Sequence, residues 1–446
     1  MTTATYTPRL WHKLLAVGAV CMLPLALTRC ADDPQEPNAP KPPGASPDPA
    51  LTILGISCDD GQLSSGAPYQ VCVNQQLWNG DLVIFVPGYT NPAATPTTPT
   101  GDIGGLSAKD VVTSLGYAWA TIGWVGLVVP DSWIDGDLLS LVQTAKTFLQ
   151  NRVRRTFLTG GSQGGLITTL GVEQHPEVFT GGGLAACGPT GSYRKQLEYV
   201  GDFRTVFDYY FNRVIPDWPV WTQDPPGYGA VDPTFWNAAN RAAVANAIQA
   251  YPARTANVLS VTKAPIDGGN PGPTTQLTVD DLLRYTFVGT NEAMAKLDGL
   301  AYGNVGRIYS GSSNDRALNR GIERFTFTAS DAALQKLETT GMLKRPLVTI
   351  YTTGDHIVPV WHESLYRSKT TSSFTSWLLY SGIKVTRYGH CTFTPEEVLG
   401  AFALLVLKVT GQNLVLTQHA LPEPRSRAEF LRAAREFGAS PTVVSK

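Results

Sequence analysis

Residues 156–165 read TFLTGGSQGG, and this stretch decides the fold. Its first five residues form an apolar, β-branched run that predicts a buried strand. A tight glycine turn follows, and the apolar run at residues 166–170 predicts a helix immediately behind that turn. Ser162 therefore lies between a strand and a helix, within the pattern Gly-x-Ser-x-Gly. Small neighbours leave room where the two elements approach each other, so we expect the Ser162 hydroxyl to project above a sheet.

Strands and helices alternate on both sides of this stretch. Further strands are predicted at residues 81–89, 119–124, 183–187, 346–351 and 382–388. A helix is predicted at residues 138–149 with Asp137 as its N-cap, and a last helix runs from a capping box at Thr394 to Gly411. The charged tail at residues 412–446 is predicted to be a surface helix or a disordered end. Strands separated by helices indicate an α/β fold class, a mostly parallel sheet with helices on both faces.

The alternation stops between residues 191 and 342. This segment is rich in aromatic residues and holds an alanine-rich helix candidate at residues 238–250. We expect it to be a cap inserted over the C-terminal edge of the sheet, between core segments 51–190 and 343–411. Its aromatic side chains either face a binding site or form the core of the insertion itself. They include Tyr209, Tyr210, Phe211, Trp218, Trp221, Tyr228 and Trp236.

Composition narrows the class of partner. The chain has 446 residues, enough for one large core with an insertion or for two domains. Only 16% of the residues are charged and the formal net charge is -1, without a dense run of Lys or Arg in the body of the chain. This charge balance gives no reason to expect a nucleic acid as a partner.

The first thirty residues have the pattern of a targeting segment. Arg9, His12 and Lys13 precede an apolar run at residues 14–28, which is too short to span a membrane. We interpret residues 1–30 as an export signal, which predicts a secreted, periplasmic or membrane-tethered protein. An N-terminal membrane anchor or a buried helix is the alternative. The proline-rich stretch at residues 31–50 is predicted to be a flexible linker outside the fold.

Cys30 closes the stretch LTRC at residues 27–30, which resembles the lipobox of bacterial lipoproteins. That resemblance implies a lipidated Cys30 and a protein tethered to a membrane through its N-terminus. Arg29 departs from the pattern, because the residue before the cysteine is normally small. The sequence therefore leaves two alternatives open, a free exported protein and a lipoprotein.

A base for the Ser162 hydroxyl has to come from few candidates. Three of the six histidines lie in the N-terminal segment, at the end of the helix after Ser162 or in the tail, and the others are His356, His362 and His390. His390 and Asp355 both end predicted strands, and the C-terminal ends of parallel strands meet at one edge of a sheet. Taken singly, Asp355 also fits a turn-capping carboxylate, and His390 a loop histidine.

The stretch TGDHIVP at residues 353–359 resembles the acid loop of α/β-hydrolases. The resemblance covers most of residues 51–190 and 343–411 and does not cover the cap. It implies the α/β-hydrolase fold, with Ser162 as nucleophile, His390 as its base and Asp355 as the group that orients the base. Gly354 directly precedes Asp355, which is a small departure from the pattern of the superfamily.

The resemblance also implies an oxyanion hole made of two backbone N–H groups. One belongs to Gln163, at the start of the helix after the nucleophile. We assign the other to Tyr89 in the turn VPGY at residues 86–89, where Gly88 allows close approach. Many lipases and esterases have a His-Gly start at this loop and this chain does not, so an ordinary Pro-Gly turn is the alternative.

Four cysteines in the expected folded part, Cys58, Cys72, Cys187 and Cys391, allow three disulfide connectivities in an exported protein. We favour Cys58 with Cys72 and Cys187 with Cys391. The pair of Cys391 and the histidine before it resembles the tannase and feruloyl esterase branch, where a disulfide ties the histidine loop to the nucleophile region. In that branch the partner cysteine directly precedes the serine. A glycine has that place here, so Cys187 is the expected substitute, and two separate buried thiols are the alternative.

These patterns together predict a secreted serine hydrolase that cleaves small or polymeric carboxylic esters through an acyl-enzyme. A serine peptidase of the same superfamily is the main alternative, and a non-catalytic binding protein on a hydrolase scaffold is a second one. No cofactor is expected, and no metal site, because spacings such as C-x-x-C or H-E-x-x-H do not occur. The acyl and alcohol specificity and the oligomeric state stay open.

Overall fold

The structure of the chain is a computed structural model. It describes residues 55–99, 101–103, 106–128, 130–212, 214, 233–418, 420–421 and 423–445. The predicted targeting segment, Cys30 and the linker lie outside the described residues, as do Trp218, Trp221 and Tyr228 of the insertion. Within the described ranges, no helix combines the length and the apolar character needed to cross a bilayer.

An eight-stranded sheet forms the centre of the protein, in the order β1-β2-β6-β3-β7-β8-β9-β10. Its strands are β1 (Ile56–Gln62), β2 (Pro68–Asn74), β6 (Ala118–Ile122), β3 (Asp81–Val86), β7 (Arg155–Gly161), β8 (Gly183–Ala186), β9 (Leu347–Gly354) and β10 (Tyr380–Tyr388). β2 pairs antiparallel with both of its neighbours, and all the other neighbouring strands are parallel. This mostly parallel sheet confirms the predicted α/β-hydrolase fold.

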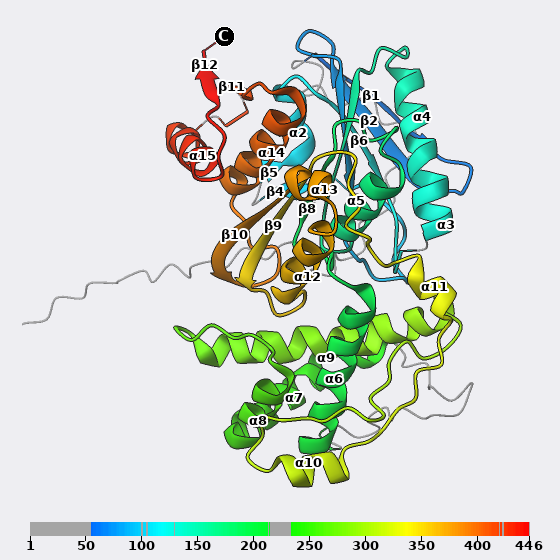
Figure 1. Cartoon of the computed structure of the whole chain (residues 1–446), viewed down its shortest axis with the longest axis vertical. Coiled ribbons are helices and arrows are strands. Elements are labelled where there is room, and N and C mark those ends of the chain that lie inside the picture. Colours follow the sequence, from blue (N-terminus) through cyan, green and yellow to red (C-terminus); the bar gives the residue numbers. More distant parts are fainter. Residues whose placement is uncertain are drawn as a thin grey trace, which may run out of the picture.

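Helices cover both faces of the sheet because its central strands are buried on both faces. Along β3, Leu82 and Ile84 belong to one apolar cluster and Val83 to the other. The first cluster also contains residues of α4 (Leu139–Phe148), α5 (Gln163–Gln174) and α12 (Trp361–Thr370). The second contains residues of α2 (Ala108–Ser114), α14 (Pro395–Thr410) and α15 (Pro424–Glu436). Figure 1 shows α4 and α14 on opposite sides of the sheet.

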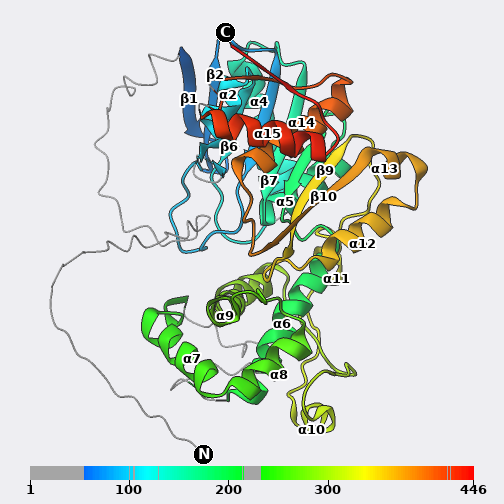
Figure 2. The ribbon, with the colours of Figure 1, turned by 90° about the vertical axis from the view of Figure 1, so that its left-hand side faces the viewer.

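The chain between β8 and β9 forms helices, which we call the inserted helices. They are α6 (Tyr193–Tyr210), α7 (Ala238–Ala250), α8 (Pro252–Thr262), α9 (Pro271–Lys296), α10 (Asp315–Gly321) and α11 (Asp331–Gln335). They form a layer beyond the C-terminal ends of the parallel strands (Figures 1 and 2). The two ends of the insertion meet, since the Thr339 hydroxyl donates to the carbonyl of Thr190 at 2.6 Å.

The aromatic side chains of the insertion serve largely as its own core. Phe203, Phe207, Phe211 and Phe287 are fully or almost fully buried in one cluster within it. Tyr209, Tyr210 and Trp236, which the sequence singled out, pack partly buried against this cluster. The sequence left open whether these aromatic side chains face a binding site or form the core of the insertion. The described ones belong to the core of the insertion.

Of the two helix N-termini that the sequence predicted in detail, one is wrong and one is confirmed. Asp137 as the N-cap of the helix at residues 138–149 is wrong, because a π-helix (Trp133–Leu138) runs directly into α4. The Asp137 carboxylate instead accepts the indole N–H of Trp124 at 3.0 Å. The last helix, α14, has the predicted capping box of Thr394 with Glu397.

The tail after α14 is ordered over most of its length. α15 packs against α14, and its Phe430 is fully buried, so the alternative of a surface helix holds for this part. The remaining short elements are β4 (Asp102–Ile103), β5 (Leu106–Ser107), α3 (Pro130–Ser132), a 3₁₀-helix (Pro233–Phe235), α13 (Phe374–Leu379), β11 (Val415–Thr417) and β12 (Thr442–Val444).

Candidate active site

The turn between β7 and α5 holds Ser162 in a strained conformation. Its φ of 56° and ψ of −124° lie where non-glycine residues are rare. The flanking glycines are required by close approach: a Cβ on Gly160 would lie 2.5 Å from the carbonyl oxygen of Gly164, and one on Gly164 would lie 2.3 Å from that of Val86. This is the strand, turn and helix arrangement that the sequence predicted.

Three side chains from three strand ends form one hydrogen-bonded chain. The Ser162 hydroxyl lies 2.9 Å from Nε2 of His390, and Nδ1 of His390 lies 2.8 Å from Oδ2 of Asp355. The other carboxylate oxygen of Asp355 accepts the backbone N–H groups of Ile357 and Val358, at 2.9 and 2.8 Å. Asp355 is 1% exposed, so the three hydrogen bonds hold a buried carboxylate in one orientation.

This geometry can move a proton. An imidazole whose Nδ1–H is held by a carboxylate presents Nε2 as an acceptor for the hydroxyl proton of a serine. The three residues are those that the sequence assigned to one site, and the structure brings them together.

The two other candidate histidines are occupied elsewhere. His356 places Nε2 2.7 Å from Oδ2 of Asp281, on α9. His362 lies 2.9 Å from the side-chain oxygen of Gln196 through Nε2, and its Nδ1 accepts the backbone N–H of Gly191. Burial, and then the nearby Lys369 ammonium, hold the pKa of His362 well below its ordinary value, so this ring is neutral.

Both expected oxyanion donors lie beside Ser162. Gln163 is the first residue of α5, where a backbone N–H has no acceptor within the helix. The loop carrying Tyr89 is close as well, since a Cβ on Gly88 would lie 3.2 Å from Cβ of Ser162. Among the described residues, neither the Tyr89 nor the Gln163 backbone N–H donates to a protein acceptor. Tyr89 and Gln163 also line the same pocket as Ser162.

The side chain of Gln163 has a role that the sequence did not reveal. Its amide nitrogen donates to the carbonyl of Gly126 at 2.9 Å, and its oxygen accepts the N–H of Val128 at 3.0 Å. Leu127, between them, donates its N–H to Glu292 of α9 at 2.8 Å. The loop at residues 126–128 is thus fixed from both sides. A sequence reading could have noted only that this position of the motif is an amide.

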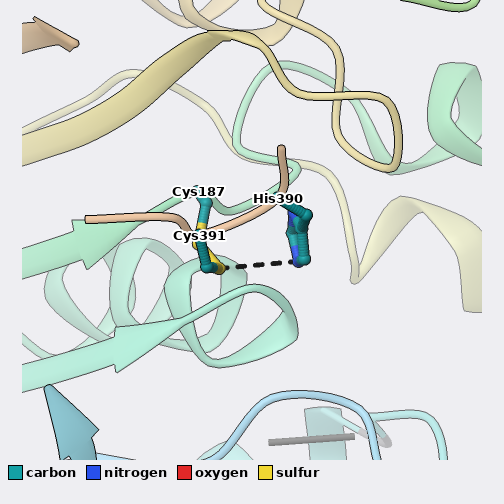
Figure 3. Close-up of side chains that lie close together, drawn as sticks. All are labelled: Cys187, His390 and Cys391. Carbon is teal, nitrogen blue, oxygen red and sulfur yellow. Dashed lines mark hydrogen bonds between the residues drawn. A yellow bond between two sulfur atoms is a disulfide. The ribbon is translucent and has the colours of Figure 1, made fainter. Parts of the chain in front are cut away.

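The structure contains both expected disulfides. Cys58 and Cys72 are direct partners across β1 and β2, with 4.1 Å between their Cα atoms. Cys187, just after β8, is bonded to Cys391, with 5.4 Å between their Cα atoms. Figure 3 shows that this second bond lies against His390, whose Nε2 is 3.5 Å from Sγ of Cys391.

Cys187, His390 and Cys391 place their donor atoms within 4.8 Å of one another, as metal ligands would. A thiolate is the form of cysteine that binds a metal, and both sulfur atoms here are joined to each other. The cluster is therefore a disulfide next to an imidazole, and its donor set does not suit a metal ion.

A pocket opens at Ser162, between the core and the inserted helices. Its walls include Tyr89, Leu127, Ile357 and Val358 of the core, Tyr193, Leu197, Val200 and Gly201 of α6, and Tyr285, Gly289, Thr290 and Ala293 of α9. None of the described residues that line it is charged. Burial, and then the Glu292 carboxylate, raise the pKa of both Tyr89 and Tyr193, so these phenols are neutral. The sequence did not predict the lining residues of α6 and α9.

Comparison with known proteins yields similarity of structure alone. No protein-family model and no curated protein matches the chain. Feruloyl esterase B from Aspergillus oryzae is similar over 76% of this chain and 74% of its own, at 12% identity and a TM-score of 0.40. An esterase from Pyrococcus furiosus is similar over 88% of this chain and 98% of its own, at 12% identity and a TM-score of 0.37.

A peptidase is among the similar structures too. An acylaminoacyl peptidase in complex with a chloromethyl ketone is similar over 80% of this chain and 41% of its own, at 11% identity and a TM-score of 0.38. Likenesses at these identities and scores do not separate esterase from peptidase activity. The choice between the two depends on the site itself.

Proposed function

We propose that this protein is an exported serine hydrolase that cleaves carboxylic esters through an acyl-enzyme. The observation that carries the proposal is the hydrogen-bonded chain of Ser162, His390 and Asp355, whose serine lines an uncharged pocket. In it Ser162 is the nucleophile, His390 the general base and Asp355 the residue that holds the imidazole in the required tautomer. Tyr89 and Gln163 supply the oxyanion donors.

The proposed reaction has two halves. Nε2 of His390 takes the Ser162 proton while Oγ attacks the ester carbonyl, and the negative oxygen of the tetrahedral intermediate accepts the N–H groups of Tyr89 and Gln163. The imidazolium then protonates the departing alcohol, which leaves an ester bond to Ser162. Water, deprotonated by the same imidazole, attacks this acyl-enzyme and releases the acid. Asp355 stabilises the imidazolium in both halves.

The pocket favours an ester over a peptide. A peptidase that trims chain ends needs a charged group to pair with the terminus of its substrate, and a buried charge without a partner is costly. The described lining contains no such group. The complete hydrogen-bonded chain argues against a binding protein that has lost its catalytic residues. A cofactor has no role in this mechanism.

Export is part of the proposal. Two disulfides within the described residues suit a protein that folds in an oxidising compartment, because thiols stay reduced in the cytosol. Tethering through a lipidated Cys30 is the alternative to free secretion. Mass spectrometry of the N-terminal peptide from membrane and soluble fractions separates the two, since a diacylglyceryl group on Cys30 retains the protein with the membrane.

The testing experiment compares ester and amide hydrolysis. The protein lacking residues 1–30 is assayed on p-nitrophenyl esters and on the matching p-nitroanilides, next to Ser162→Ala and the control Ser368→Ala on the exposed face of α12. We expect ester hydrolysis that Ser162→Ala abolishes and Ser368→Ala leaves intact. Faster hydrolysis of the anilides would favour the peptidase, and activity unchanged by Ser162→Ala would disprove the site.

A further inference from the structure

Gly289 lies in the interior of α9, a helix of 26 residues. Glycine is, after proline, the least favourable residue in a helix interior, so its presence calls for a reason. Close packing is one common reason, and several glycines of this chain show it: a Cβ on Gly201 of α6 would lie 2.2 Å from the ring of Tyr302. An added side chain at such a position would clash.

Gly289 is different. Apart from its two chain neighbours and the backbone of its own helix, the nearest described atom to a Cβ added there is Cδ1 of Tyr285, at 4.0 Å, and Tyr285 belongs to the preceding turn of the same helix. Its φ is not positive either, so the backbone conformation does not require glycine. Neither contact nor conformation in the described structure explains the residue.

The space in front of Gly289 is the pocket that opens at Ser162. Tyr285, Gly289 and Ala293 are spaced by four residues and therefore lie on one face of α9. All three line the pocket, together with Ser162 and Gln163. The missing side chain of Gly289 thus leaves volume inside the pocket rather than at a packing interface.

We propose that Gly289 is a specificity-determining residue that keeps this pocket deep enough for an uncharged, apolar acyl group. This inference rests on the proposed esterase function and names its substrate class. Any side chain at position 289 would occupy the space that the acyl group fills. A small acyl group such as acetyl needs none of that space.

The acyl group, rather than the alcohol, suits this pocket. During the reaction the acyl group stays bonded to Oγ of Ser162 while the alcohol leaves and water enters. The pocket is enclosed by core loops on one side and by α6 and α9 on the other. Such a pocket suits the acyl group, which stays bound to the enzyme until water releases it. Its uncharged lining offers no partner to a charged acyl group, which would lose its hydration on entering.

The test compares Gly289→Leu with Gly289→Ala and with the control Gly272→Leu. Gly272 lies in the first turn of the same helix, is exposed and would meet no atom within 4 Å through a Cβ. The substrates are p-nitrophenyl esters from acetate to decanoate, which differ only in the acyl group. All three variants are expected to fold, and Gly289→Ala to raise the Tm by about 1 °C at most.

Gly289→Leu is expected to lower kcat/KM for decanoate relative to that for acetate by about 10-fold to 200-fold, because a filled hydrophobic pocket discriminates by this much. Gly272→Leu is expected to leave this ratio unchanged. An unchanged acyl-length profile in Gly289→Leu would overturn the proposal.

Binding separates this inference from the proposed activity. Decanamide is uncharged and requires no catalysis, so its binding can be measured by calorimetry on the wild-type protein and on Gly289→Leu. Weaker binding by the variant supports the pocket assignment even if no ester is hydrolysed. Equal binding, or none to the wild type, disproves it whatever the activity.

Discussion

Asp281 Oδ2 lies 2.7 Å from Nε2 of His356, so α9 is joined to the loop that begins with Asp355. The ring of His356 stacks on that of Tyr388 with 5.1 Å between the centroids, and the Tyr388 hydroxyl lies 2.8 Å from that of Thr278, also on α9. Tyr388 is two residues before His390. One inserted helix therefore contacts both loops that carry the partners of Ser162.

The first prediction concerns Asp281. His356 is 2% exposed and its Nδ1 has no hydrogen-bond partner among the described residues, so Asp281→Ala would leave a buried imidazole without either partner. We expect a loss of about 1–3 kcal/mol in the free energy of unfolding, measured in urea. We also expect a lower kcat with little change in KM, because the loop of Asp355 loses its support.

Asp280→Ala is the matched control on the same helix. Asp280 pairs with Arg241, which is 42% exposed, and an exposed ion pair contributes about 1 kcal/mol at most. We expect kcat to stay unchanged in Asp280→Ala. In Asp281→Asn, which keeps an acceptor oxygen for His356, we expect kcat to recover most of the loss seen in Asp281→Ala. Equal losses of kcat in Asp280→Ala and Asp281→Ala would show that the contact does not act on the site.

The second prediction concerns the orientation of His390. In Asp355→Asn the amide can donate to Nδ1, which favours the tautomer that carries its proton on Nε2 and cannot accept the Ser162 proton. We expect kcat to fall by about 10⁴-fold while the protein stays folded. Single-turnover kinetics with an activated ester and a thermal melt measure the two effects. A fall of less than tenfold would contradict the orienting role of Asp355.

The third prediction compares the two disulfides. Cys187→Ala with Cys391→Ala opens a link between residues 204 positions apart, next to His390. We expect a loss of about 2–5 kcal/mol in stability and a clear loss of kcat. Cys58→Ala with Cys72→Ala opens a link 14 positions apart in the edge hairpin, far from Ser162 in the strand order.

We expect this second double variant to lose about 3 kcal/mol in stability and to keep its kcat. Urea unfolding measures the stability of each double variant, and ester kinetics measure its kcat. If both variants keep full activity, the Cys187 to Cys391 bond does not position His390.

The fourth prediction concerns pH. Burial lowers the pKa of His362 in the folded protein, so the unfolded chain binds more protons below its ordinary pKa of about 6.5. Stability is full above that pH and falls as the pH drops, by up to about 1.4 kcal/mol per pH unit for this group. His362→Gln is expected to flatten the fall between pH 6.5 and 5. Parallel pH profiles of wild type and variant would contradict this assignment.

Much of the core was predictable because its signals are local. The strand, turn and helix around Ser162 depend on an apolar run and on glycines such as Gly160 and Gly164, where an added Cβ would lie less than 3 Å from neighbouring atoms. Asp355 and His390 could be assigned because each follows a predicted strand, as the acid and the base do in the α/β-hydrolases that the sequence resembles, and parallel strands bring their ends together. The capping box of α14 was visible for the same reason, since its partners are three residues apart.

Features formed by tertiary contact could not be read in this way. β1 is a largely exposed edge strand, and its sequence ISCDDGQ lacks a buried apolar run. Asp137 has the residue type and the position of an N-cap, but its carboxylate accepts a hydrogen bond from the indole of Trp124 instead. The spacing of the two residues in the sequence does not predict this contact. The pocket joins residues of the core to α6 and α9, so its lining and the role of Gly289 emerge only from the fold.

The hydrogen bond between Thr339 and Thr190 has a consequence for protein engineering. The insertion leaves and re-enters the core at adjacent points, so one short junction joins it to the sheet. The same junction can accept a helical segment from another protein. A transplanted segment would have to supply a carboxylate for His356, as Asp281 does here. This requirement limits which segments could be used to give the scaffold a new specificity.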